Sequence, residues 1–182
     1  MRVDALFERG AIHAVYGPNG AGKSVFLRGL AGLDPFTKAT LRRHQERPLS
    51  LSYFHNQMVA PFYSFTQHFR LLQIMTGRHS RDWALLNLVQ NLVSSEQNEG
   101  GLKTIGLALA NEGEVILLDE PFTLLAKAEA LLLTGLLEEL KRRGKCIVVA
   151  THELEWAQEN ADYLLVLQKG SSLFGSRDYI LN

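Results

Sequence analysis

The sequence predicts an α/β fold in which a mostly parallel sheet is flanked by helices and interrupted by a small helical insert. Short apolar runs alternate with segments of helical periodicity, as in strands joined by crossover helices. A glycine-rich turn follows the first apolar run and opens a helix. The middle of the chain instead repeats apolar residues at helical spacing, which indicates an insert between two α/β halves.

The first elements surround the glycine-rich turn. Residues Ala11–Tyr16 are apolar and bounded by glycines, which predicts a buried strand. Lys23–Leu30 read as a helix that Gly32 ends. Leu51–Phe54 predict another short strand.

The insert is predicted from two groups of apolar residues at helical spacing. The first group lies within 71–75 and the second within 83–93, and Ser80 is placed to cap the second helix. We therefore expect a helical subdomain in this part of the chain.

The second half repeats the order of strand, helix, strand. Its expected strands and helices are Val115–Leu118, Lys127–Arg143, Cys146–Ala150, Glu153–Asn160 and Tyr163–Leu167, followed by a turn into a short edge strand.

Composition favours one compact domain without a bias toward nucleic acid. The chain has 182 residues, and its 19 basic residues equal its 19 acidic ones, so no nucleic-acid partner is expected. The single cysteine, Cys146, is expected to be a small buried hydrophobe. No apolar run approaches the length of a membrane span and the N-terminus lacks a signal-like core, which favours the cytoplasm.

The glycine-rich turn fits the pattern G-x-x-x-x-G-K-[ST], which indicates the fold of a P-loop NTPase. Its glycines let backbone N–H groups surround phosphates, and the helix N-terminus adds partial positive charge. Lys23 is expected to reach the terminal phosphates of ATP, and Ser24 to hold Mg²⁺. The predicted nucleotide-binding residues are Gly17, Pro18, Asn19, Gly20, Ala21, Gly22, Lys23 and Ser24.

Polar residues follow two of the predicted strands, at the sheet edge where ligands bind in such folds. Asp119 is expected to position Mg²⁺, and Glu120 to polarise the attacking water. His152 follows the next strand and is expected to lie near the γ-phosphate. The alternative, that these are ordinary polar residues at strand ends, is disfavoured by the complete P-loop.

These motifs together resemble the nucleotide-binding subunit of ABC-type ATPases over nearly the whole chain. The P-loop has that family's form, Ile116–Pro121 are similar to its Walker B segment with the catalytic glutamate, and Thr151-His152 match its switch histidine. The resemblance implies one ATPase domain over 1–182, with an α/β core formed by 1–63 and 111–182 and a helical subdomain over 64–110.

A further segment, Tyr53–Gln57, resembles the Q-loop of that family. The resemblance implies that Gln57 contacts Mg²⁺ and the attacking water; Gln67 and Gln73 are alternatives for this role.

Three features depart from the family pattern. The best match to its signature motif, Leu-Ser-Gly-Gly-Gln, is the segment Val93–Gln97, in which Ser94 and Gln97 are kept but both glycines are missing and Glu96 adds negative charge. Gly100-Gly101 are a possible shifted remnant. Ala126 stands where an aspartate facing the partner belongs, and neither Phe7 nor Tyr16 matches the aromatic residue that stacks on adenine.

The departures define a hypothesis of asymmetry. Residues directed at the chain's own nucleotide are intact, whereas those directed at a partner's nucleotide, near Ser94–Gln97 and at Ala126, are altered. The resemblance implies a second ATPase subunit in a head-to-tail dimer. A heterodimer with one active composite site and a homodimer with a divergent signature both fit.

The function implied is ATP binding and hydrolysis that power a multi-subunit membrane transporter, with the chain peripheral on the inner face of the cell membrane. The apolar residues 58–65 mark the expected contact with an integral membrane subunit, or else packing between subdomains. The short length of the chain and the stretch from Asp119 to Thr123 also resemble small exporter-type subunits, including those of haem export in cytochrome c maturation. Alternatives are a soluble ABC-type ATPase not tied to transport and a nucleotide-binding regulator with little hydrolysis.

Overall fold

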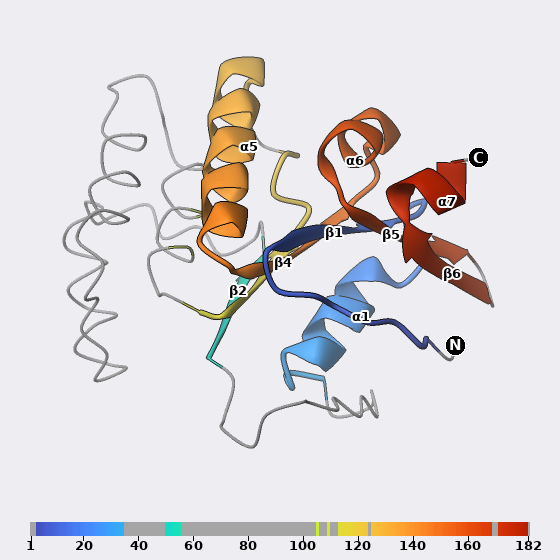
Figure 1. Cartoon of the computed structure of the whole chain (residues 1–182). Helices are drawn as coiled ribbons and strands as arrows, with labels where there is room; N and C mark the ends of the chain where they lie inside the picture. Colours follow the sequence, from blue (N-terminus) through green and yellow to red (C-terminus); the bar gives the residue numbers. More distant parts are fainter. Residues whose placement is uncertain are drawn as a thin grey trace.

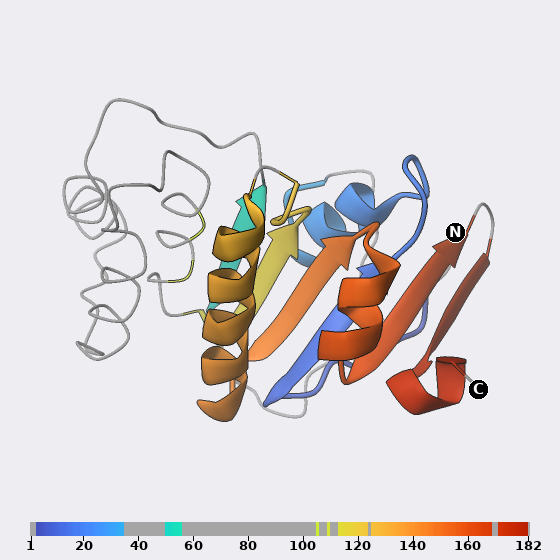
Figure 2. The ribbon, with the colours of Figure 1, turned by 90° about the horizontal axis from the view of Figure 1, so that it is seen from above.

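A computed structural model describes residues 3–34, 50–55, 105, 109, 113–123, 125–168 and 171–181. Within them, six strands form one sheet in the order β2-β3-β4-β1-β5-β6 (Figures 1 and 2). Neighbouring strands from β2 to β5 pair in parallel, and β6 pairs antiparallel with β5. This topology confirms the predicted α/β fold with a mostly parallel sheet.

The elements follow the predicted order closely. Their bounds are β1 Ala11–Tyr16, α1 Lys23–Leu30, β2 Leu51–His55, β3 Val115–Asp119, α5 Lys127–Arg142, β4 Cys146–Thr151, α6 Leu154–Asn160, β5 Tyr163–Gln168, β6 Ser171–Ser176 and α7 Arg177–Leu181.

The observed strands β2 to β5 each extend one residue beyond the predicted apolar run. The added residues are polar: His55, Asp119, Thr151 and Gln168. They remain in the ladder, where His55 pairs with Asp119 and Asp119 pairs with Ala150. The pattern of hydropathy therefore ends one residue before the backbone pairing does, and the extra residue is the one that carries a polar side chain to the sheet edge.

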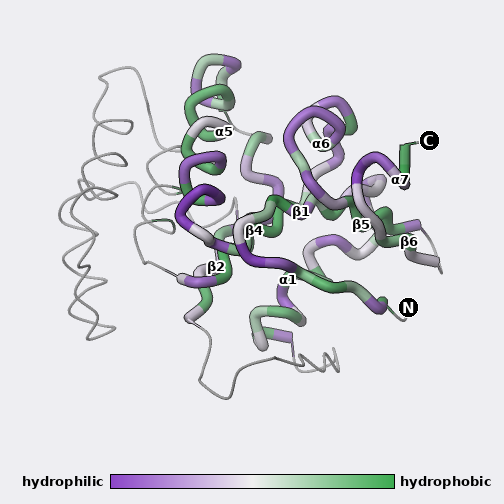
Figure 3. Tube along the Cα trace, viewed as in Figure 1, coloured by the Kyte–Doolittle hydropathy of each residue, from purple (hydrophilic) through white to green (hydrophobic). Residues whose placement is uncertain are grey.

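Helices cover both faces of the sheet, as predicted. Figures 1 and 2 show α5 and α6 together on one face and α1 on the other. Hydrophobic residues concentrate along the strands, whereas α5 and α6 also contain many hydrophilic residues (Figure 3). We call the two sides the α5/α6 face and the α1 face.

Each face has its own hydrophobic cluster. On the α5/α6 face, Leu133, Leu137 and Leu140 of α5 pack with Ile12 and Ile147 of the sheet. On the α1 face, Leu27 packs with strand residues that include Cys146, whose burial raises the thiol pKa to about 11. Cys146 is thus a buried hydrophobe, as expected.

Part of the predicted organisation lies outside the described residues. Of the expected helical subdomain over 64–110, the structure describes Ile105 and Leu109, which are helical and belong to the cluster on the α5/α6 face. The short helix α7 was not predicted, because its five residues are too few to show a helical period. None of the helices described is both long and apolar enough to span a bilayer.

Candidate nucleotide and metal site

The glycine-rich turn connects β1 to α1 and requires glycine for two different reasons. A side chain at Gly17 would meet the backbone oxygen of Leu167 at 2.5 Å, so only glycine fits between β1 and β5. Gly20 and Gly22 have φ angles of 80° and 99°, which L-residues with side chains rarely adopt. Glycine therefore lets the backbone of the loop pack closely against β5 and adopt turns that other residues avoid.

Lys23 begins α1 and folds back over this turn. Its Nζ donates to the carbonyl oxygens of Gly17, at 2.7 Å, and Pro18, at 3.4 Å. The side chain is 5% exposed, so its charge needs an anion nearby. That anion is Glu120, whose Oε1 lies 3.1 Å from Nζ.

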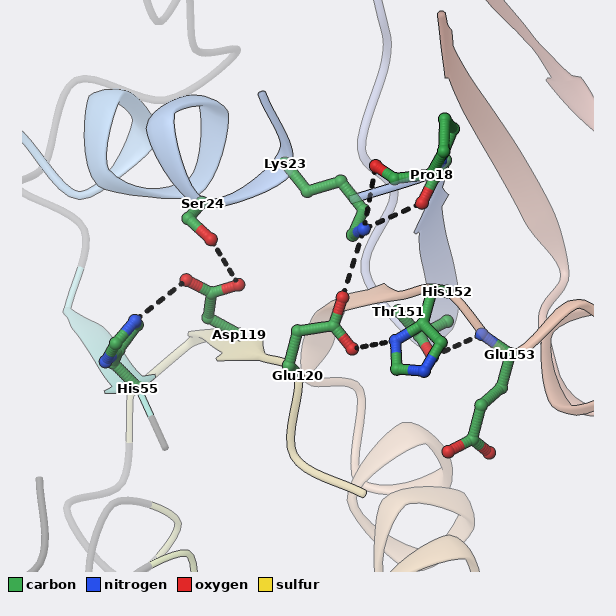
Figure 4. A network of polar contacts seen from close by, with 10 residues as sticks. Pro18, Lys23, Ser24, His55, Asp119, Glu120, Thr151, His152 and Glu153 are labelled. Atoms are coloured by element: carbon green, nitrogen blue, oxygen red, sulfur yellow. Dashed lines mark hydrogen bonds and ion pairs between the residues drawn. The ribbon is translucent and has the colours of Figure 1, made fainter. Parts of the chain in front are cut away.

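Glu120 joins the lysine to the predicted histidine (Figure 4). Its other carboxylate oxygen, Oε2, lies 2.8 Å from Nδ1 of His152. The backbone at Glu120 has φ of 51°, the left-handed conformation, and its N–H donates to the carbonyl of Ala150 at 2.9 Å. The turn at the end of β3 thus directs the carboxylate between Lys23, at the start of α1, and His152, which follows β4.

Asp119 faces the other side of the same edge. Ser24 donates its hydroxyl to Oδ1 of Asp119 at 3.0 Å, and the Asp119 side chain is 1% exposed. A hydroxyl and a carboxylate are the hard oxygen donors that Mg²⁺ prefers, and Mg²⁺ sites often use one carboxylate with substrate phosphates. Among the described residues, no three His, Cys, Asp or Glu side chains gather as a metal site. The Ser24–Asp119 pair, beside a phosphate cradle, fits this mode of binding.

Two residues of β2 also approach Asp119, and neither was singled out for a role of its own in the sequence. The Tyr53 hydroxyl donates to Oδ2 of Asp119 at 3.4 Å, and Nε2 of His55 lies 3.6 Å from the same oxygen. Burial and the charge of Asp119 raise the Tyr53 pKa to about 12, so the phenol stays protonated. The sequence contains a hint of these contacts, because side chains two residues apart on a strand point to the same face and Tyr53 and His55 are two residues apart in β2.

Several predicted residues lie outside the described part of the chain. These are Gln57, the segment Ser94–Gln97 and the apolar residues 58–65. Their roles therefore stay predictions. Ala126 is described: it is exposed and precedes α5, where its N–H donates to the Glu129 carboxylate at 2.8 Å.

The arrangement is chemically suited to phosphoryl transfer. A cradle of backbone N–H groups, a buried lysine and a helix N-terminus favour a polyanion, while Asp119 and Glu120 supply oxygen donors beside it. Phosphoryl transfer requires mainly positioning and charge stabilisation, which this set can provide without a covalent intermediate on the protein.

Comparison with known proteins agrees with this chemistry. A family model described as ABC transporter matches residues 1–123. The aliphatic sulfonates import ATP-binding protein SsuB 2 of Rhizobium johnstonii is 33% identical, over 92% of this chain and 70% of its own length. The ribose import ATP-binding protein RbsA 1 of Burkholderia thailandensis is 29% identical over 92% of this chain, which spans only 38% of that protein.

Solved structures show the same similarity. A chain from an ABC transporter in an inward-facing conformation aligns with 96% of this chain and 76% of its own length, at a TM-score of 0.74 and 26% identity. An ATP-binding subunit of an ABC transporter has the same fold, with a TM-score of 0.77, 24% identity, and coverage of 96% of this chain and 82% of its own.

Proposed function

We propose that this chain, which belongs to the ABC transporter family, binds ATP with Mg²⁺ and hydrolyses it to power a multi-subunit membrane transporter. One observation carries the proposal: the ends of β1, β3 and β4 bring Lys23, Glu120 and His152 into one network at an edge of the sheet, beside the hydrogen-bonded pair of Ser24 and Asp119. The lysine is buried and the two acids are adjacent, as phosphoryl transfer to water requires.

In this proposal each residue has a defined task. Gly17–Ser24 surround the phosphates, and Lys23 pairs with the terminal ones. Ser24 and Asp119 would hold Mg²⁺, with Gln57 as a further ligand. When bound, Mg²⁺ neutralises charge on the phosphate oxygens. Glu120 orients and polarises the attacking water, and His152 holds the γ-phosphate and that water in place.

The ion pair between Lys23 and Glu120 bears on how a phosphate would bind. Lys23 is paired with Glu120, so an incoming phosphate must replace the carboxylate as the partner of Nζ. The exchange leaves Glu120 Oε1 without its cation and available to a water, while Oε2 keeps its contact with His152. ATP binding would in this way activate the residue that directs hydrolysis.

The family membership also supports the proposed partners. We infer a second ATPase subunit, either identical or different, and an integral membrane subunit that contacts the chain near 58–65. The names of SsuB 2 and RbsA 1 both describe import ATP-binding proteins, which supports a role in transport. The proposed location is cytoplasmic, at the inner face of the cell membrane.

The test is ATP turnover of the purified chain as a function of protein concentration. Glu120→Gln removes the carboxylate charge and is expected to abolish turnover while ATP still binds. Glu153→Gln is the matched control, because Glu153 is exposed and its carboxylate points away from the network in Figure 4.

The outcomes are distinct. Turnover that rises steeply with concentration, is lost in Glu120→Gln and is kept in Glu153→Gln would support a self-sufficient homodimer. Tight ATP binding without turnover would point to a different partner subunit that completes the site. A chain that does not bind ATP with Mg²⁺ would contradict the proposed function.

A further inference from the structure

Asp119 is held from two sides by different elements. Oδ1 accepts the hydrogen bond from Ser24 at the start of α1, at 3.0 Å. Oδ2 faces β2, where the Tyr53 hydroxyl lies at 3.4 Å and His55 Nε2 at 3.6 Å. Figure 4 shows Asp119 between Ser24 and His55.

The register of the sheet produces this arrangement. His55 is the direct partner of Asp119 in the ladder between β2 and β3, and Tyr53 is the partner of Leu117. Side chains two residues apart on a strand point to the same face. Both β2 side chains therefore lie on the α1 face, beside the carboxylate, whereas Phe54 between them is buried in the cluster on the α5/α6 face.

We propose that Tyr53 and His55 are positioning residues that fix the Asp119 carboxylate so that Oδ1 is presented to the metal ion. This inference rests on the proposed function, since it concerns the Mg²⁺ that Ser24 and Asp119 would hold. It adds two residues of β2 that the family motifs do not include among the ligands.

The physical argument starts from the burial of Asp119. A carboxylate that is 1% exposed cannot rely on water, so each oxygen needs a partner within the protein. With Oδ2 occupied by β2, the carboxylate does not rotate to offer that oxygen to Ser24. Groups that hold metal ligands in this way commonly change metal affinity about 10- to 100-fold when removed.

A role in packing alone would favour apolar residues at these positions. The chain could fill the same volume with phenylalanine and leucine and avoid placing polar groups at half-buried positions. Instead β2 directs a hydroxyl and an imidazole to one carboxylate oxygen.

The experiment measures ADP affinity by calorimetry in Mg²⁺ and in EDTA. The ratio of the two dissociation constants is the gain that Mg²⁺ contributes. For Tyr53→Phe and His55→Leu we expect this gain to fall about tenfold, while affinity in EDTA stays at the wild-type value. His55→Gln keeps an N–H donor and is expected to restore most of the gain.

The matched control is Tyr179→Phe, which removes a hydroxyl from a ring that is 74% exposed and lies in α7. It should leave the gain unchanged. If His55→Leu does not fold, Tyr53→Phe decides the question, since it deletes one oxygen and keeps the ring.

Equal losses with and without Mg²⁺ would show a merely structural role and overturn the inference. So would a gain that both variants leave at the wild-type value, and in that case the proposed function stands. A wild-type chain that shows no gain from Mg²⁺ overturns both proposals.

Discussion

The two faces of the sheet bury different kinds of side chain. On the α5/α6 face, the described residues bury mostly aliphatic and aromatic groups, and the polar side chains buried there are the neutral Ser52 and Thr151. The α1 face instead buries His13 and Asp119, with Lys23 at the start of its helix. The α5/α6 face thus buries almost only uncharged groups, whereas the α1 face also buries ionisable ones, with Asp119 and Lys23 at the candidate site.

The contrast indicates that the α1 face contributes mainly to ligand binding and the α5/α6 face mainly to stability. Buried ionisable groups lower stability unless they are paired, so they are expected where function needs them. Substitutions on the α1 face should then affect ligand binding and pH response, and substitutions on the α5/α6 face should affect stability. Each of the following experiments tests whether the two faces have these separate effects.

The largest effect is expected at Lys23. Lys23→Met removes the buried ammonium group that Glu120 and the P-loop carbonyls surround, so a phosphate loses its main cation. Loss of such a charge-assisted bond corresponds to about 100-fold weaker ADP binding. Calorimetry would measure it, with Arg28→Met, an exposed change on the same helix, as the control. Unchanged affinity in Lys23→Met would contradict the placement of the site.

The next effect concerns the opposite face. Leu137 of α5 is 0% exposed in the cluster on the α5/α6 face. Leu137→Ala is expected to lower the free energy of unfolding by about 2–5 kcal/mol, because it removes buried methyl groups and leaves a cavity. Urea unfolding measures the change, and Leu131→Ala, at a position that is 67% exposed, is the control. If the folded Leu137→Ala protein binds ADP much more weakly than the wild type, the two faces do not have separate effects on stability and binding.

The smallest effect is a pH response on the α1 face. Burial lowers the His13 pKa from its ordinary 6.5, although Glu8 and Asp162 partly oppose this. Below about pH 6.5 the His13 side chain binds a proton in the unfolded chain but not in the folded chain. The free energy of unfolding therefore falls as pH decreases from about 6.5. The urea midpoint should drop between pH 7 and pH 5.5.

His13→Phe supplies the comparison for that measurement. The ring of His13 stacks on Tyr163 at 4.9 Å between centroids, and a phenyl ring keeps this stacking without titrating. Phenylalanine loses the hydrogen bond from the Glu8 N–H to Nε2, so the two proteins are compared by how their midpoints change with pH and not by the midpoints themselves. The midpoint of His13→Phe should therefore fall less over the same pH range. An identical fall in both proteins would assign the acid sensitivity to other groups.

Sequence patterns predicted most of the described fold because the strands are buried on both faces. Runs such as Cys146–Ala150 are continuous and apolar, and glycines bound the first strand. The hydrophobic pattern and the turn residues therefore indicate the same strands. The ends of the strands were less predictable. Polar residues such as His55 and Asp119 lie in the ladder, although hydropathy alone places them in loops.

The placement of the candidate residues was predictable where a motif specifies backbone geometry, as at Gly17–Ser24, and where strand ends converge, as for Glu120 and His152, whose roles stay predictions. The pairing of Lys23 with Glu120 depends on a turn in the left-handed conformation, which no hydrophobic pattern reveals. The contacts of Tyr53 and His55 with Asp119 depend on the register between β2 and β3, which requires knowing that these strands are neighbours.

The backbone conformation of Glu120 has a consequence for how this chain would respond to selection for heat tolerance. A residue with a side chain at φ of 51° carries about 1 kcal/mol of conformational strain that glycine would relieve. Loss of this glutamate would, however, leave the buried Lys23 without its anion, and an unpaired buried charge costs more than the strain that glycine relieves. Selection for heat tolerance and selection for turnover would therefore both retain Glu120.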